Sequence, residues 1–432
     1  MSEQNSKLTE VRNNILPILL RDLENYKVPA KDRQKAIEQF IPKYLKQFSI
    51  QLSESETNQL VQNMIDEVLG FGILQPLLED PLVTEIMVNG TQPVYVERAG
   101  LLSETDIRFN NDDEILRIID RIVLPLGRRI DSENPTVDAR LPDGSRVNAV
   151  VPPIAIDGPL LTIRKFAQDK YSIEQLIDMG TMTDHMATFI QACVVSRLNI
   201  LITGGTGSGK TTMLNAISSF IPEGERIITI EDAAELKLQQ KHVARMESKM
   251  PSLLDRKGVN MRDLVRNALR MRPDRIVIGE VRGAECLDML QAMNTGHDGS
   301  MTTLHANSPR DAIYRMETMT LMSELDLPVK VIRSQIASAI DVIIHLSRLK
   351  GGNRRITYIT EISGMEADTV VMSDIFKFEQ SGIDRTGAVI GELRPTGIRP
   401  LFTTKLEANG FKLSPEVFGA NLAEILREQQ RM

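Results

Sequence analysis

Residues 204–211 read Gly-Gly-Thr-Gly-Ser-Gly-Lys-Thr, a spacing of glycine, lysine and hydroxyl groups that suits phosphate binding. The glycines let the backbone curl so that several N–H groups point at one anion. Lys210 is then placed to reach the β- and γ-phosphates of a nucleotide, and the Thr211 hydroxyl to bind Mg²⁺. The residues expected to contact the nucleotide are Gly204, Gly205, Thr206, Gly207, Ser208, Gly209, Lys210, Thr211 and Thr212.

The residues on either side of this loop argue against a chance glycine-rich turn. Leu198–Thr203 has the pattern of a buried strand, and Thr212–Phe220 has the pattern of a helix. Such a helix adds its positive amino end to a phosphate site. The sequence therefore predicts that the chain binds ATP with Mg²⁺ and hydrolyses the nucleotide.

Two further strand patterns end in carboxylates. The run 275–279 is followed by Glu280, and the run 228–230 is followed by Glu231 and Asp232. Parallel strands place ligands at their carboxyl ends, so Glu231 and Glu280 are expected to orient the attacking water. A surface position for Glu280 and a helix N-cap role for Asp232 remain open as alternatives. The predicted metal-binding residues are Thr211, Glu231, Asp232 and Glu280.

Two histidines, His297 and His305, border the threonine-rich run 300–304. An isolated histidine is usually structural or exposed. Two histidines that flank one strand of a nucleotide-binding sheet are better placed to contact phosphate or to relay a change of state. His297 and His305 therefore join Lys210, Glu231 and Glu280 as candidate catalytic residues.

Arginines in the first half of the chain are candidates for a second set of phosphate contacts. Arg140, Arg146 and Arg164 lie on short strand patterns around the Asp143-Gly144 turn. The planar guanidinium binds phosphate with two hydrogen bonds and keeps its charge, so it suits the transition state of phosphoryl transfer. We expect Arg146 and Arg164 to act in catalysis; the alternative is that they are solvated strand residues.

Periodicity divides the chain into three parts. Residues 1–75 form a helical N-terminal extension, because apolar side chains recur there at helical spacing. Residues 76–168 form a small α+β domain with an antiparallel sheet, indicated by Asn-Gly and Asp-Gly turns between short alternating runs. Residues 169–432 alternate strand and helix patterns, which predicts an α/β domain with a parallel sheet.

Composition excludes several classes of protein. Two cysteines far apart, Cys193 and Cys286, exclude a cysteine zinc site and do not suggest a disulfide framework. A net charge of −7 and 4% aromatic residues offer little for nucleic-acid tracking, so no nucleic-acid partner is expected. No apolar run reaches the roughly 18 residues needed to span a bilayer, which predicts a cytoplasmic protein.

Four motifs occur in a diagnostic order: GGTGSGKT, TIEDAAEL, RPDRIVIGEVRG and TGHDGSMTTLHANSP. They resemble the Walker A, Asp box, Walker B and His box of the type II/IV secretion (traffic) ATPase superfamily. The phrases VTEIMVNG, VYVERAG, DARLPDGSRVNAVVPP and LTIRKF most resemble the branch that serves tight-adherence (Flp-type) pili. The resemblance covers roughly residues 65–365. Other branches usually carry a four-cysteine metal motif, from which this chain departs.

The resemblance implies a RecA-like P-loop ATPase domain preceded by a small (PAS-like) α+β domain, assembled as a hexamer. It implies a motor for pilus assembly or protein secretion that acts on an inner-membrane platform protein and associates peripherally with that membrane. It carries Lys210, Thr211, Glu231, Glu280, His297 and His305 onto the family's catalytic positions. The alternatives are a pilus-retraction or DNA-transfer motor, a regulatory ATP-binding module and a RecA-like helicase.

Overall fold

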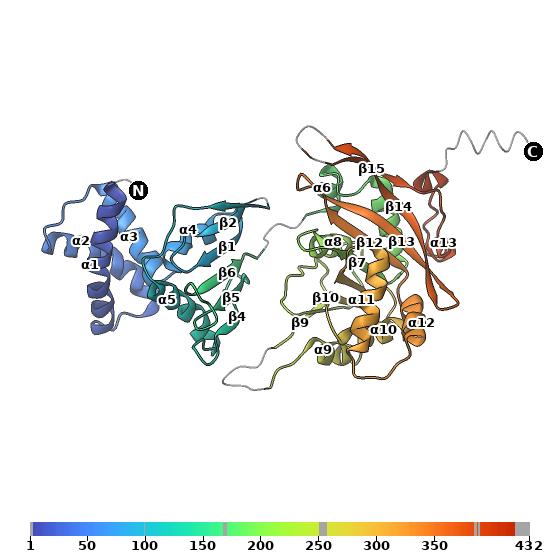
Figure 1. The fold of residues 1–432 in the computed structure, drawn as a ribbon, viewed down its shortest axis with the longest axis horizontal. Coiled ribbons are helices and arrows are strands. Elements are labelled where there is room, and N and C mark those ends of the chain that lie inside the picture. The colour runs from blue at the N-terminus through green and yellow to red at the C-terminus, as the bar shows by residue number, and fades with distance from the viewer. Residues whose placement is uncertain are drawn as a thin grey trace, which may run out of the picture. The chain divides into compact units, whose positions relative to one another are not determined.

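The computed structural model describes residues 3–98, 100–166, 171–249, 257–383, 387 and 389–419. The chain divides into two compact units, Met1–Phe166 and Ala167–Met432 (Figure 1). The domain boundary that the sequence predicts at 168 and 169 lies outside the described residues.

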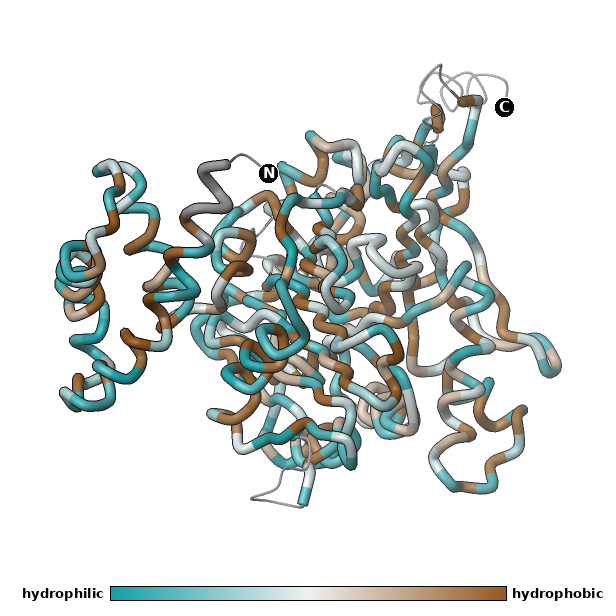
Figure 2. The backbone as a smooth tube through the Cα atoms, turned by 60° about the vertical axis from the view of Figure 1, so that its left-hand side comes forward, coloured by the Kyte–Doolittle hydropathy of each residue, from teal (hydrophilic) through white to brown (hydrophobic). Residues whose placement is uncertain are grey.

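No helix in the described part of the chain is long and apolar enough to cross a membrane. Hydrophobic and hydrophilic residues instead alternate over short distances along the backbone (Figure 2). This short-range alternation is the pattern of helices and strands that have one buried face.

The first unit begins with helical structure, as the periodicity predicts, in the form of three helices: α1 (Glu3–Asn25), α2 (Arg33–Gln47) and α3 (Glu54–Val68). The third begins at a capping box, in which the Ser53 hydroxyl accepts from Glu56 N–H and the Glu56 carboxylate accepts from Ser53 N–H. The three helices bury one small core, formed mainly by Ile15, Leu19, Ile37, Ile41, Leu60 and Met64.

An antiparallel sheet, also as predicted, completes this unit; it has six strands in the order β3-β2-β1-β6-β5-β4. Alternating residues of the strands face α5 and form a separate core with it. The sequence did not indicate β3, because every residue of that strand is exposed. The elements are η2 (Gly72–Leu74), α4 (Gln75–Glu79), β1 (Val83–Asn89), β2 (Tyr95–Arg98), β3 (Leu101–Glu104), α5 (Asp112–Val123), β4 (Thr136–Arg140), β5 (Arg146–Val150) and β6 (Leu160–Arg164).

The second unit is built on a nine-stranded sheet in the order β15-β14-β13-β12-β7-β11-β10-β8-β9. Strands β9, β8, β10, β11, β7 and β12 are parallel, and β13, β14 and β15 continue the sheet in antiparallel pairing. The sheet is therefore mixed rather than parallel throughout. Its strands are β7 (Ile200–Gly204), β8 (Ile227–Glu231), β9 (Val243–Glu247), β10 (Arg275–Val281), β11 (Met301–His305), β12 (Val342–Arg348), β13 (Arg354–Glu366), β14 (Thr369–Ile383) and β15 (Val389–Pro395).

Helices cover both faces of this sheet. One core joins α6, α7 and α8 to side chains such as Ile200 and Ile202, and the other joins α9 to α12 to side chains such as Leu201. Neighbouring residues of β7 thus point to opposite faces, as a pleated strand requires. The helices are α6 (Ile173–Asp178), α7 (Asp184–Val195), α8 (Lys210–Ser218), α9 (Met261–Ala268), α10 (Glu285–Asn294), α11 (Pro309–Leu321), α12 (Val329–Ala339) and α13 (Thr403–Ala408).

Candidate active site

The glycine-rich loop lies where the sequence places it, between the buried strand β7 and helix α8. Glycine is required at 204, because a Cβ there would lie 2.4 Å from the Leu346 carbonyl oxygen and 2.5 Å from Ser208 Oγ. Gly209 takes a φ of 96°, a left-handed conformation that lets the helix start directly at Lys210. The loop and the amino end of α8 together form a concave backbone surface of the kind that binds phosphate.

Lys210 is almost fully buried beside this loop. Its Nζ donates to the Gly205 carbonyl oxygen at 2.9 Å and lies 3.3 Å from His305 Nδ1. The ammonium group is therefore folded back onto the loop, where bound phosphate would compete for it.

Glu280 is hydrogen-bonded through one carboxylate oxygen, and its other oxygen, which makes no hydrogen bond among the described residues, lies close to His305. Oε1 lies 3.0 Å from His305 Nε2, and Oε2 accepts from Arg282 Nε at 2.9 Å and Arg282 Nη2 at 2.5 Å. A continuous series of polar side chains therefore lies at the carboxyl end of the sheet, in the order Lys210, His305, Glu280 and Arg282.

The surroundings of His305 favour its neutral form. Burial lowers the pKa of His305 below its usual value, and the charge of Lys210 lowers it further, although Glu280 acts in the opposite direction. A neutral imidazole between an ammonium and a carboxylate can replace one hydrogen-bond partner by another while the net charge of the site stays the same.

Glu231 is a buried carboxylate with an oxygen to spare. Oε2 accepts from the backbone N–H groups of Glu235 and Leu236 at 2.7 and 2.8 Å. Oε1 is buried and makes no hydrogen bond within the described residues. Burial raises the pKa of Glu231, against the two backbone N–H groups, which lower it.

The sheet register places Glu231 beside the residue that precedes Glu280. Ile230 pairs with Ile278, and a Cβ at Gly279 would lie 2.9 Å from Glu231 Cγ. Because residue 279 is glycine, the Glu231 side chain has room beside the backbone that leads into Glu280.

Asp232 is hydrogen-bonded to a residue just after β9. Its Oδ1 accepts from the Ser248 hydroxyl at 2.9 Å. The alternative that Asp232 caps a helix is wrong, because residues 232–242 contain no helix.

The predicted magnesium residues fit a site that relies on phosphate and water for most of its ligands. Among the described residues, no three histidine, cysteine or acidic side chains gather as a metal-binding cluster. Mg²⁺ at nucleotide sites keeps several waters and takes one or two protein oxygens plus phosphate oxygens. The Thr211 hydroxyl in the first turn of α8 and the spare buried oxygen of Glu231 suit that role. When bound, the ion would offset negative charge on the phosphates.

The structure brings His305 to the phosphate loop but not His297. Strand β11 runs from Met301, opposite Ile200, to His305, opposite Gly204. His297 precedes this strand and therefore lies toward the amino end of the sheet, where its Nδ1 is 3.3 Å from the Ala292 carbonyl oxygen.

The arginines of the first unit form a row across its sheet. Arg140 pairs with Arg146, Arg146 with Arg164, and Arg164 with Glu85, on four adjacent strands. Arg164 Nε lies 3.5 Å from Glu85 Oε1. Like charges directly opposite each other in a sheet are destabilising, so a row of three arginines is a surface suited to an anion.

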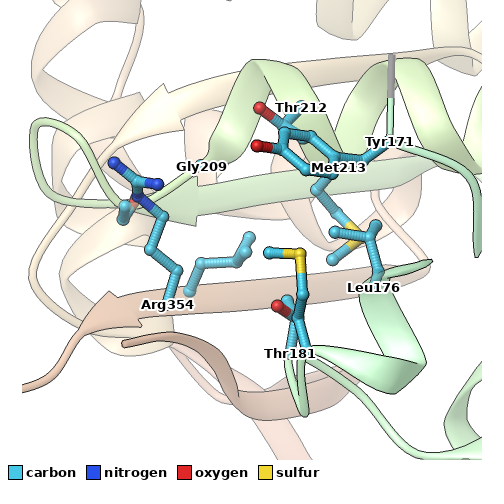
Figure 3. A pocket seen from close by; sticks show the side chains of 10 residues that line it. Tyr171, Leu176, Thr181, Gly209, Thr212, Met213 and Arg354 are labelled. Atoms are coloured by element: carbon cyan, nitrogen blue, oxygen red, sulfur yellow. The ribbon is translucent and has the colours of Figure 1, made fainter. Parts of the chain in front are cut away.

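A pocket opens beside the phosphate loop within the second unit (Figure 3). Apolar side chains and one aromatic ring form most of its lining, and Arg354 forms a cationic wall. Thr212 and Met213 of α8 contribute to it, which makes the pocket continuous with the phosphate loop. Its main lining residues are Tyr171, Leu176, Met179, Thr212, Met213 and Arg354.

Sequence reasoning missed three polar residues around the loop: Arg282, His345 and Arg354. His345 Nδ1 lies 2.8 Å from the Thr203 hydroxyl, under the loop. Arg282 follows Glu280 by two residues, so a cation next to a strand-ending carboxylate was an available signal. His345 and Arg354 carried no such signal, because only the pairing of β12 with β7 brings them near the loop.

Comparison with known proteins gives a consistent result. Residues 67–385 match the family described as Type II/IV secretion system protein. A putative conjugal transfer protein of Mycobacterium tuberculosis (strain H37Rv) is 36% identical over 321 residues, 73% of this chain and 91% of that protein. Conjugal transfer protein TrbB of Rhizobium radiobacter is 34% identical over 292 residues, 66% of this chain and 86% of that protein.

Among solved structures, the VirB11 ATPase of the Brucella suis type IV secretion system, in complex with sulphate, is 29% identical. The match covers 66% of this chain and 94% of that one, with a TM-score of 0.37. The family match spans well over half of the chain, so the chain belongs to the Type II/IV secretion system protein family. It is an ATP hydrolase of the secretion type.

Proposed function

We propose that this family member powers pilus assembly of the tight-adherence type, or type II/IV secretion, by cycles of ATP binding and hydrolysis in a hexameric ring. Its second unit would be the RecA-like motor domain and the sheet of its first unit a PAS-like domain. The partner we propose is a polytopic platform protein of the inner membrane, at whose cytoplasmic face the motor would act.

The proposal of ATP hydrolysis rests on the series of polar side chains beside the phosphate loop, Lys210–His305–Glu280–Arg282. Lys210 contacts a neutral carbonyl group and His305, and Arg282 is paired with Glu280, so an incoming γ-phosphate can compete for both cations. Glu280 would then be left to orient water. Glu231, buried next to it, would hold solvent near the metal.

We propose that Arg146 and Arg164 bind phosphate during turnover. Their support is the arginine row itself, which concentrates positive charge on one face of a small domain. Release of that contact after hydrolysis would let the small domain move, and this motion would be the power stroke.

A second candidate function is DNA transfer, and the names of the conjugal transfer relatives favour it. The two functions differ in what stimulates the motor. A DNA-transfer motor would respond to single-stranded DNA or to a DNA-bound partner, whereas a pilus or secretion motor would respond to its membrane platform.

The test is ATP turnover of the purified chain with single-stranded DNA and, separately, with inner-membrane vesicles from its own host. Stimulation by vesicles alone, with a pilin and a polytopic membrane protein co-purifying in detergent, supports the pilus reading. Stimulation by DNA alone supports DNA transfer. Full activity of a sedimenting monomer would contradict the ring.

A further inference from the structure

The turn between β12 and β13 reaches the phosphate loop. Arg354, the first residue of β13, donates from Nε to the Gly207 carbonyl oxygen at 2.9 Å. A Cβ at Gly209 would lie 3.5 Å from Arg354 Cδ, and a Cβ at Gly207 would lie 3.8 Å from Arg348 Nη1. Two arginines of this turn thus lie over two glycines of the loop.

The same arginine also faces the pocket. Arg354 lines it opposite Tyr171 and Thr212, with its guanidinium next to Gly209 (Figure 3). Two residues further along β13, Ile356 donates its N–H to the Thr181 carbonyl oxygen at 2.9 Å, and Thr181 is part of the pocket lining. The start of β13 is therefore hydrogen-bonded to the phosphate loop on one side of the pocket and to the backbone of Thr181 on the other.

The charge of Arg354 is not committed to a carboxylate. Within the part of the chain that the structure describes, no acidic side chain forms an ion pair with it, and its hydrogen bond is to a neutral carbonyl group. By contrast, Arg282 is paired with Glu280. A guanidinium held by one N–H, beside a phosphate loop, keeps its other donors for an anion.

We propose that Arg354 is a positioning residue for the nucleotide: it holds the phosphate loop through Gly207 and contacts the bound nucleotide from the pocket side. This inference rests on the phosphate loop being the ATP site. Because the contact exists with bound nucleotide before and during the chemical step, its loss weakens binding uniformly and leaves the chemical step unchanged.

Steady-state ATP hydrolysis and ADP affinity test this with Arg354→Gln, which keeps much of the length and removes the charge. We expect KM for ATP and Kd for ADP to rise about threefold to tenfold, the effect of a charge-assisted hydrogen bond at an exposed site, with kcat within about twofold of wild type. Arg354→Lys restores the charge and most of the affinity. Lys350→Gln removes a cation from the same turn and leaves both constants unchanged.

Several results would overturn the proposal. KM and Kd of Arg354→Gln matching those of Lys350→Gln would show that Arg354 does not contact nucleotide. A loss of kcat at unchanged KM would place Arg354 in the chemistry or the folding instead. Normal behaviour of Arg354→Gln together with an inactive Lys210→Ala refutes only this inference, whereas turnover in Lys210→Ala refutes the ATP site itself.

A measurement on the wild-type protein covers the case in which Arg354→Gln does not fold. Phenylglyoxal modifies exposed arginines, and mass spectrometry reads each site separately. ADP is expected to slow modification of Arg354 several-fold and to leave Arg394, exposed on β15, unaffected. Equal rates at Arg354 with and without ADP would overturn the proposal.

Discussion

The two ends of the nine-stranded sheet carry charged clusters of different kinds. At the amino end, Arg275 is fully buried. It binds Glu225 at 2.5 Å and donates to the carbonyl oxygens of Val194 and Gly299 at 2.8 and 3.2 Å. Arg197 binds the same Glu225 at 3.0 Å. This cluster joins β10 to the segments around it.

At the carboxyl end, Arg282 is paired with Glu280 and Lys210 lies beside His305, but the arrangement is incomplete. Arg282 is half exposed, and the buried oxygen of Glu231 has no hydrogen-bond partner among the described residues. A cluster that is buried and internally satisfied serves the fold, whereas one that keeps spare donors and acceptors at an open edge serves a ligand.

The sharpest test of this difference is Glu280→Gln at the carboxyl end. The change keeps the shape and removes the charge that orients water, so we expect ATP turnover to fall about a hundredfold to ten-thousandfold. ATP binding and assembly should be retained. The measurement is turnover and nucleotide affinity on one preparation. If Glu231→Gln abolishes ATP turnover and Glu280→Gln keeps it, Glu231 rather than Glu280 orients the water.

The matching change at the amino end is Glu225→Ala. It leaves the buried Arg275 without its counter-ion, which costs about 3–5 kcal/mol of folding free energy. Thermal or denaturant unfolding measures the loss. For whatever folded protein remains, KM for ATP should be unchanged, because this cluster is at the far end of the sheet from the loop. A raised KM at unchanged stability would contradict a structural role.

Acid should weaken the second unit through His345. Burial lowers the pKa of His345 to about 4. As the pH falls, this histidine is therefore protonated near pH 6.5 in the unfolded chain but only near pH 4 in the folded chain. Stability contributed by the neutral form is complete above pH 6.5 and is lost as pH falls toward 4. Between pH 6.5 and 5 the loss is about 1.5 kcal/mol.

His345→Gln is the control for that measurement, because glutamine does not titrate. Its unfolding free energy should change less between pH 6.5 and 5 than that of the wild type. All five histidines lie at 185 or beyond, so the first unit should show no histidine-linked change. An equal pH dependence in wild type and variant would exclude His345 as the source.

The smallest expected effect concerns the arginine row of the first unit, where arginines lie opposite one another on adjacent strands. Arg146→Ala or Arg164→Ala should leave nucleotide binding nearly normal and reduce hydrolysis at least about tenfold, the lower end for an arginine that stabilises phosphoryl transfer. Affinity and turnover are measured together. Turnover within twofold of wild type for both variants would direct attention to Arg140.

Local pattern was sufficient for several features. The spacing of residues 204–211 between a strand and a helix predicted the loop, because its geometry depends on neighbouring residues only. Alternation and turn residues predicted the antiparallel sheet of the first unit for the same reason. The carboxylates at the ends of β8 and β10 were also found by position along the chain.

The tertiary structure decided which of those groups meet. Strand order places β11 and β10 side by side, and this brings His305 to Glu280 while leaving His297 toward the amino end of the sheet. Pairing of β12 with β7, and of β13 with β12, brings His345 and Arg354 to a loop more than a hundred residues away. Sequence shows where a strand ends, but the edge at which two distant strands meet depends on the register and order of the whole sheet.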